Sequence, residues 1–318
     1  MDVVRRVYDG ARAGQRIVAN IYRPRTPAQS GQPLTLLLAH ANGFHKELWE
    51  PTLERLFAHA DDRWAIAEAI ALDGYNHGDS AALNREFIIG ETSSSWFLCA
   101  RDILTVLRQL QSPHPIVGIG HSWGATSLLL AELISPQTFA ALIATDPILY
   151  TAPEPNTEVV KMTNRRRAEW ADEAAARKYF ESHPFFSAWD SRILDRHIRH
   201  GLEPVNAGDG APRPRLVLKC RPSCESAVYT GALHSSVFAT RNLWRIQCPT
   251  AFLTGEKSVP TPPRHIAAIT RDIPDCTRAV MPAAGHLLVH EAPDATADHY
   301  IEFLARFAPK MHGHKPKF

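Results

Sequence analysis

The chain has 318 residues, of which 45% are hydrophobic and 21% are charged, and this composition excludes a disordered or fibrous protein. Its 35 Lys and Arg residues nearly balance its 33 Asp and Glu residues, and a net charge of +2 argues against nucleic acid as a partner. No apolar run reaches the roughly 18 residues of a membrane-spanning helix, and five cysteines without a CxxC pair argue against a disulfide framework or a metal site.

The first part of the chain alternates predicted strands and helices. Two segments of alternating polarity, residues 3–8 and 16–22, flank a Gly-containing turn and predict an antiparallel hairpin. A continuous apolar run at residues 34–39 is typical of a strand that is buried on both faces of a sheet. The alternation continues with a helix, a strand and an amphipathic helix at residues 49–60, 64–72 and 92–110.

The same alternation reaches residue 150, is interrupted, and resumes near residue 248. Predicted strands and helices follow one another at residues 115–120, 125–134, 139–145, 251–254, 263–270, 277–281 and 295–307. Residues 151–247 are rich in Pro, Arg and aromatic side chains and predict a mainly helical insertion. We therefore expect a core of residues 1–150 and 248–318, the second part ending in a basic tail, with a mostly parallel sheet covered by helices.

Residues 120–124 read Gly-His-Ser-Trp-Gly and fit the pattern G-x-S-x-G between a predicted strand and a predicted helix. The pattern arises by chance in about 0.05 chains of this composition. It places Ser122 on a sharp turn, where flanking glycines avoid clashes and a helix N-terminus favours negative charge. The sequence therefore predicts that Ser122 is a catalytic nucleophile.

A serine nucleophile needs a base within hydrogen-bond reach. His286 lies in the small-residue loop Pro-Ala-Ala-Gly-His, between the last predicted strand and the last predicted helix. His290 is the alternative, and we interpret it as a solvent-facing loop residue. We predict that His286 is the base.

Two carboxylates are candidates for the acid that orients this base. An acid is usual in the loop after residues 251–254, but that loop holds Ser258 at the expected position and Glu256 two residues earlier. Asp146 ends the preceding strand on the same carboxyl edge, where open α/β sheets build their sites. Both keep the chain order Ser, acid, His. We predict Asp146 as the acid, with Glu256 as the alternative; the competing interpretation of Asp146 is a turn former.

Acyl transfer also requires N–H donors for the oxyanion. The first is predicted to be the backbone N–H of Trp123, directly after the nucleophile. The second is expected in the loop that follows residues 34–39, where Gly43 permits a sharp turn. We predict the Asn42 N–H, with Ala41 as the alternative. His77 lies in another Gly-rich loop, and we interpret it as structural rather than catalytic.

These motifs resemble the α/β-hydrolase superfamily. Residues 40–51, 76–80, 165–167 and 218–220 are similar to a fungal branch that contains a yeast peroxisomal lipase, hydrolases of host-selective-toxin biosynthesis and the acyl-CoA hydrolase of mycophenolic acid biosynthesis. The resemblance implies an α/β-hydrolase fold: an eight-stranded, mostly parallel sheet with an N-terminal antiparallel hairpin, helices on both faces and a helical lid after the sixth strand. In that branch the acid can follow the sixth strand, which favours Asp146.

The expected substrate is an ester or thioester of an apolar acyl group, with a coenzyme A thioester as a leading candidate and a role in fungal secondary metabolism implied by the resemblance. No metal or cofactor is needed for this chemistry. Aromatic side chains predicted either to line the acyl pocket or to form the lid's packing face are Phe44, Trp170, Phe180, Phe185, Phe186 and Trp189. Arg165, Arg166 and Arg167, with Lys161, are either a solvated helix face or contacts for coenzyme A phosphates.

Two other functions stay open at this point. The same residues could serve an acyltransferase or a lactone-forming or lactone-opening enzyme, and a catalytically silent ligand-binding protein is the non-enzyme alternative. The final tripeptide Pro316-Lys317-Phe318 differs from Ser-Lys-Leu at two of three positions, so both a peroxisomal and a cytoplasmic location are expected alternatives.

Overall fold

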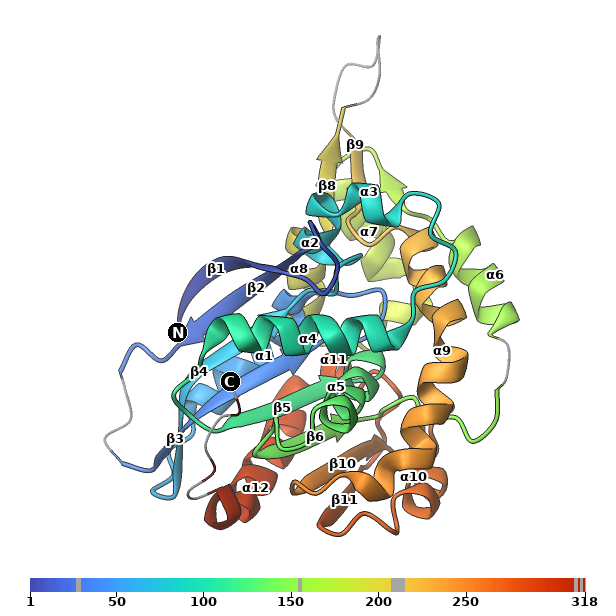
Figure 1. The fold of residues 1–318 in the computed structure, drawn as a ribbon. Helices are drawn as coiled ribbons and strands as arrows, with labels where there is room; N and C mark the ends of the chain where they lie inside the picture. Colours follow the sequence, from blue (N-terminus) through green and yellow to red (C-terminus); the bar gives the residue numbers. More distant parts are fainter. Residues whose placement is uncertain (27–29, 154–155, 207–214, 312–313, 315–316, 318) are drawn as a thin grey trace.

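The computed structural model describes residues 1–26, 30–153, 156–206, 215–311, 314 and 317. Its centre is an eight-stranded sheet with the order β1-β2-β4-β3-β5-β6-β10-β11 (Figure 1). The strands are β1 (Asp2–Asp9), β2 (Arg16–Arg23), β3 (Gln32–Ala39), β4 (Trp64–Leu72), β5 (Ile116–His121), β6 (Ala141–Thr145), β10 (Thr250–Gly255) and β11 (Cys276–Met281).

The pairing of these strands confirms the predicted fold class. β1 and β2 form the N-terminal antiparallel hairpin, and β2 pairs with β4 in the antiparallel direction. In the order β4-β3-β5-β6-β10-β11, each strand pairs with the next in the parallel direction. Because parallel strands all end at the same edge, the loops after β3, β4, β5, β6, β10 and β11 meet along one side of the sheet.

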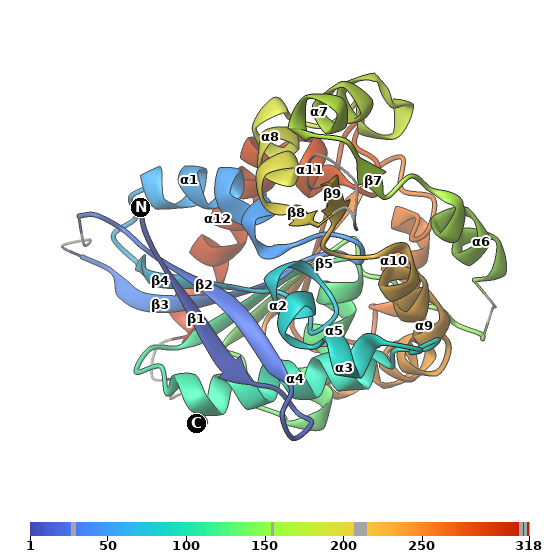
Figure 2. The same cartoon turned by 90° about the horizontal axis from the view of Figure 1, so that it is seen from above.

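Helices cover both faces of the sheet, as Figure 2 shows. Along β3, Leu36 and Leu38 belong to one hydrophobic cluster with α1 (Glu50–Ala58) and α12 (Pro293–Met311). Leu37 points to the opposite face, into a cluster with α4 (Trp96–Leu110) and α5 (Trp123–Ile134). This alternation is the period of two that a strand imposes on its side chains, so a strand covered on both faces is apolar throughout.

Residues 151–247, which we call the lid, connect β6 to β10. Their helices are α6 (Thr157–Arg165), α7 (Glu173–Ser182), η2 (Pro184–Phe186), α8 (Ser191–His200), α9 (Pro222–Asn242) and η3 (Leu243–Arg245). A small antiparallel sheet of β7 (Glu169–Trp170), β8 (Leu202–Val205) and β9 (Arg215–Leu218) was not predicted. Its strands are only two to four residues long, too short to show a period of two in the sequence.

The helix α9 joins the lid to the core. Its side chains Val228, Ala232 and Ala239 are buried in the same hydrophobic cluster as α4 and α5, and α9 packs against α4, α5 and α6. The remaining short helices lie in the loops of the core: η1 (Lys46–Trp49), α2 (Gly78–Leu83), α3 (Arg85–Ile88), α10 (Pro263–Ile269) and α11 (Leu288–Glu291). In the described part of the chain, no helix is both long enough and apolar enough to cross a bilayer.

Candidate active site

Ser122 lies on a sharp turn between β5 and α5, with a backbone φ of +55°. A Cβ atom at Gly120 would lie 2.5 Å from the Ala125 Cα, and one at Gly124 would lie 2.3 Å from the Ala39 carbonyl oxygen. Both contacts are too close for any side chain, so the turn requires both glycines of the motif. Ser122 therefore sits at the N-terminus of α5, where free N–H groups and the helix dipole favour negative charge.

His286 lies in the loop between β11 and α11 and faces Ser122. Its Nε2 atom is 2.9 Å from the Ser122 Oγ, and its Nδ1 atom is 3.0 Å from the Asp146 Oδ1. The structure thus brings the predicted nucleophile, base and acid into one hydrogen-bonded row, although they lie on three different loops. Asp146 is completely buried, whereas the His286 side chain is 23% exposed.

Asp146 follows β6 and is surrounded by donors. Its carboxylate accepts from the Gly255 N–H at 2.9 Å, from the Ser258 Oγ at 2.6 Å and from the Thr261 hydroxyl. Ser258, at the position where the sequence analysis expected a carboxylate, is thus a hydrogen-bond donor to Asp146. Donors of this kind stabilise the ionised carboxylate.

Glu256, the alternative acid, has another partner. Its carboxylate accepts from the Ala283 N–H at 2.8 Å, at the start of the loop that carries His286. Its contact is thus with the backbone of that loop, whereas the contact of Asp146 is with the imidazole ring. The geometry favours Asp146 over Glu256.

The loop that follows β3 holds the second predicted oxyanion donor, Asn42. Gly43 in this loop has a φ of +86°, and its N–H donates to the His77 Nε2 at 2.9 Å. The Nδ1 atom of His77 lies 2.7 Å from the Asn76 Oδ1, and its ring stacks on Trp123 with centroids 4.9 Å apart. His77 therefore joins the loop after β3 to the residue after the nucleophile, which agrees with a structural role.

Lys46 anchors the other end of the same loop. It is fully buried, and its Nζ atom lies 2.8 Å from Asp73, 2.8 Å from Asp79 and 2.7 Å from Glu47. Burial alone would lower the pKa of the Lys46 ammonium, but the charges of these carboxylates outweigh it, and the pKa lies above its ordinary value. The sequence analysis did not single out this network.

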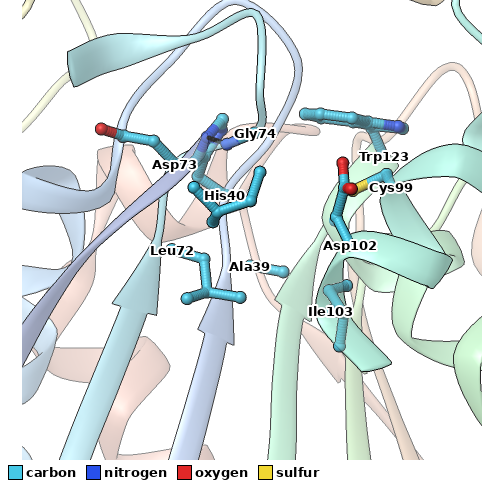
Figure 3. A pocket seen from close by; sticks show the side chains of 11 residues that line it. Ala39, His40, Leu72, Asp73, Gly74, Cys99, Asp102, Ile103 and Trp123 are labelled. Carbon is cyan, nitrogen blue, oxygen red and sulfur yellow. Dashed lines mark hydrogen bonds between the residues drawn. The ribbon is translucent and has the colours of Figure 1, made fainter. Parts of the chain in front are cut away.

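A cavity of about 20 Å³ is lined in part by Trp123 (Figure 3). Side chains from the ends of β3 and β4 and from α4 line it, among them His40, Leu72, Cys99 and Asp102. It has room for about one water molecule and is too small for an acyl chain. In the part of the chain that the structure describes, no three His, Cys, Asp or Glu side chains are grouped to hold a metal ion.

The predicted pocket residues lie in two neighbouring clusters, and Phe186 packs against both of them. Phe44 and Trp189 share a buried cluster with their ring centroids 5.3 Å apart, and Phe186 packs on Trp189 at 4.9 Å. Trp170 instead lies inside the lid's own core with Phe180, which favours a packing role for both. Phe185 is 52% exposed. Only the first group lies beside the loop of His286, since Leu287 packs against that cluster.

His290 corrects the sequence interpretation. It was expected to face solvent, but it is 2% exposed and lies between Phe44 and Trp189, with both ring centroids at 4.6 Å. Its helix, α11, turns the side chain inward against the lid, a tertiary contact that local sequence does not reveal. His290 is therefore part of the aromatic cluster.

His121 is a site residue that the sequence analysis missed. Its ring is buried, and its Nε2 donates to the backbone carbonyl oxygen of His286 at 2.8 Å. Burial, together with the neighbouring His286, lowers the pKa of His121 to about 3. His121 occupies the first x of the G-x-S-x-G motif, and a histidine directly before the nucleophile is the feature of the sequence that could have indicated its role. A neutral His121 thus ties the loop of the base to the strand of the nucleophile.

The three arginines at residues 165–167 do not share one environment. Arg165 is exposed, Arg166 forms an ion pair with Glu225, and the guanidinium of Arg167 lies over the Trp170 ring at 5.8 Å. Only part of this segment is therefore a solvated face.

Comparison of the chain with known proteins identifies its family. Residues 36–299 match the alpha/beta hydrolase family. The chain belongs to this family. It is 26% identical to the peroxisomal membrane protein LPX1 of Saccharomyces cerevisiae, over 89% of this chain and 79% of the relative. The solved structure of the peroxisomal alpha-beta-hydrolase Lpx1 superposes with a TM-score of 0.81 at 24% identity, covering 96% of this chain and 88% of Lpx1.

Two further groups of fungal relatives agree with the resemblance. The type I acyl-CoA thioesterase mpaH' of Penicillium brevicompactum is 27% identical over 61% of this chain, a match that spans only 47% of the thioesterase. The abhydrolase domain-containing protein ACTT2-1 of Alternaria alternata is 27% identical over 58% of this chain and 80% of its own length. The similarity to the fungal branch is thereby confirmed.

The buried charge network at Lys46 gives a stability prediction. Lys46→Met should lower the free energy of unfolding by about 3–5 kcal/mol, because it leaves buried carboxylates without their cation. Lys161→Met is the matched control, since Lys161 is exposed and pairs with Glu158 on the surface of α6. Its effect should stay within about 0.5 kcal/mol. Urea unfolding of both variants measures the difference, and equal effects would contradict the assigned network.

The buried histidines predict sensitivity to acid. Burial lowers the pKa values of His40, His77, His121, His197 and His290. A histidine that is neutral in the folded state takes up a proton on unfolding below pH 6.5, so its stabilising contribution is present above that pH and is lost as the pH falls. For His121 the loss runs from pH 6.5 to about 3 and amounts to about 2 kcal/mol at pH 5.

Urea unfolding between pH 7.5 and 5 tests this expectation. The unfolding free energy of the wild type should fall steadily below pH 6.5. The slope of this free energy against pH measures the number of protons taken up on unfolding, and His121→Gln should reduce that number by about one. His59→Gln, at an exposed position, should leave the slope unchanged. Equal slopes in the wild type and in His121→Gln would show that the buried ring of His121 is not held neutral.

Proposed function

We propose that this protein is a serine hydrolase that cleaves an ester or thioester through Ser122, His286 and Asp146. The observation that carries the proposal is the row of two hydrogen bonds, 2.9 Å between Ser122 Oγ and His286 Nε2 and 3.0 Å between His286 Nδ1 and Asp146 Oδ1. The name of one group of fungal relatives, a type I acyl-CoA thioesterase, supports the same chemistry.

In the proposed first step, His286 Nε2 takes the proton from the Ser122 hydroxyl as the oxygen attacks the substrate carbonyl. The Nδ1–H of His286 donates to Asp146, which fixes the tautomer and stabilises the imidazolium that forms. The donors of Gly255, Ser258 and Thr261 hold the Asp146 carboxylate in place for this contact. His286 then gives the proton to the leaving alcohol or thiol.

The negative charge that develops on the carbonyl oxygen is proposed to be held by the backbone N–H groups of Trp123 and Asn42, with Ala41 as the alternative to Asn42. Trp123 opens α5, so its N–H points out of the helix end. Each such donor contributes about 3 kcal/mol to the transition state. Water activated by His286 then hydrolyses the acyl-enzyme.

For the acyl group, we propose a pocket beside the cluster of Phe44, Phe186 and Trp189. The lid supplies two of these rings and the loop after β3 supplies the third, so the pocket lies between lid and core. An apolar wall of this kind favours a medium or large apolar acyl group. Coenzyme A thioesters are the leading candidates because of the thioesterase relative.

For the cellular location, we propose the peroxisome, with the cytoplasm as the alternative. The support is the relative whose name places it there. Two residues of the final tripeptide, Pro316 and Phe318, lie outside the described residues. The expectation based on that tripeptide therefore stays a prediction.

The acid can be tested by exchanging each candidate carboxylate for its amide. Asp146→Asn should lower kcat by about 10⁴, because an amide at this position no longer fixes the imidazole tautomer or stabilises the imidazolium. Glu256→Gln should change kcat by less than about fivefold, since that side chain accepts a hydrogen bond from the Ala283 backbone and not from His286 among the described residues. Steady-state kinetics decide between them, with thermal unfolding of each variant as the check on folding. The opposite ranking would make Glu256 the acid.

A substrate panel tests the proposed reaction. Purified wild type and Ser122→Ala are assayed with p-nitrophenyl esters and acyl-CoA thioesters of increasing chain length, and with lactones, each in the presence and absence of an acceptor alcohol. We expect turnover of apolar esters or thioesters by the wild type and loss of at least about 10³ in Ser122→Ala. Products that form only with the alcohol would indicate acyl transfer. Turnover by neither protein would indicate a silent binding protein.

A further inference from the structure

A buried ion pair from the lid lies against the loop that carries the proposed oxyanion donor. Glu225, in the first turn of α9, is 5% exposed, and its backbone oxygen accepts from the Asn42 Nδ2 at 3.1 Å. A Cβ atom at Gly43 would lie 2.8 Å from the Glu225 carboxylate. The Glu225 carboxylate therefore occupies the space beside Gly43, the residue that follows Asn42 in the loop.

A carboxylate at this position is unfavourable for the proposed reaction. The loop after β3 is where negative charge develops in the transition state, and an ionised carboxylate beside it would repel that charge. The repulsion is not screened, because Glu225 is shielded from solvent. The position therefore requires a neutralising partner.

Arg166 is that partner. It follows α6, and its guanidinium pairs with the Glu225 Oε2 atom, the carboxylate oxygen that also lies nearest to Gly43. Desolvation raises the pKa of Glu225 to about 7, and the Arg166 charge opposes that rise. Arg166 also contributes to the lowered pKa of His77, after burial and His40, so its field reaches the ring that accepts the Gly43 N–H.

The other titratable groups that face this pair are neutral near pH 7. Burial raises the pKa values of Tyr229, one turn further along α9, and of Cys220, in the loop before α9. His77 is kept neutral on the side of the core. The charge of Asp73 is balanced by its ion pair with Lys46. The charge felt by the loop after β3 therefore depends on the balance between Arg166 and Glu225.

We propose that Arg166 is a positioning residue that neutralises Glu225, so that the loop after β3 can stabilise the oxyanion only while the Glu225 carboxylate is paired with Arg166 or carries no charge. The inference rests on the proposed function. Because both members of the pair belong to the lid, it makes the correct seating of α6 and α9 a condition for catalysis. It also explains why a buried carboxylate is tolerated beside an anion-binding loop.

The test uses an ester without phosphate groups and measures kcat between pH 6 and 9.5. In Arg166→Gln, Glu225 should be protonated and harmless at the acidic end and should ionise as the pH rises. We expect kcat to fall about 10- to 100-fold at the alkaline end, a limb that the wild type lacks. Arg166→Lys should behave like the wild type, because the positive charge is retained.

The double variant Arg166→Gln/Glu225→Gln separates charge from packing. In the double variant, kcat should no longer fall at alkaline pH and should lie within about threefold of the kcat of Glu225→Gln. The kcat of Glu225→Gln should itself match or exceed that of the wild type. Arg165→Gln, the exposed neighbour, is the matched control and should leave the pH profile unchanged. Thermal unfolding is measured for every variant. If Arg166→Gln does not fold, Glu225→Gln and the double variant still decide the proposal.

The outcomes distinguish this inference from the proposed function. The inference would be overturned if kcat of Arg166→Gln is reduced equally at all pH values and the double variant does not recover it. A reduction of kcat by more than tenfold in Glu225→Gln would overturn it as well. A wild type that is active while Arg166→Gln matches Arg165→Gln would overturn the inference alone. Wild type and Ser122→Ala that are equally inactive would overturn the proposed function.

Discussion

The structure depends on one side chain, the imidazole of His286, which lies between the Ser122 hydroxyl and the Asp146 carboxylate. The three residues are far apart in the sequence. Residues 122, 146 and 286 come together because β5, β6 and β11 end at the same edge of a parallel sheet. Each contact has its own local support. Glycines hold the turn of Ser122, three donors surround Asp146, and His121 holds the loop of His286.

The second theme is how charge is managed around the loop after β3. At one end Lys46 is buried among three carboxylates, and at the other Glu225 is buried opposite Arg166. Between them His77 is neutral and accepts a backbone N–H. Buried charges of this kind contribute little net stability when paired and cost several kcal/mol when a partner is lost. Their arrangement is better explained by the need to fix this loop than by stability.

The sequence was most informative where a local pattern has one physical cause. The G-x-S-x-G turn, the apolar parallel strands and the small-residue loop before His286 each have a signature within a few residues. Ser258 was also informative. Because a hydroxyl stands where a carboxylate is usual, the sequence indicated that the acid lies elsewhere, at Asp146. In the structure the Ser258 hydroxyl donates a hydrogen bond to Asp146.

What the sequence could not give are contacts made by distant segments. His290 faces inward because the lid covers α11. Glu225 is a candidate for a functional role because the fold places its carboxylate beside Gly43 and Arg166. Lys46 looks like an ordinary surface lysine until the fold surrounds it with Asp73 and Asp79. The short strands of the lid are stabilised by one another rather than by their own pattern.

The most direct test of the central claim is covalent labelling with a fluorophosphonate, mapped by mass spectrometry of the digested protein. The account predicts one adduct, on Ser122, that forms rapidly in the folded wild type and at least about 10³ times more slowly when His286 is replaced by Ala. An adduct on another residue, or labelling of Ser122 at the same rate without the imidazole, would contradict it.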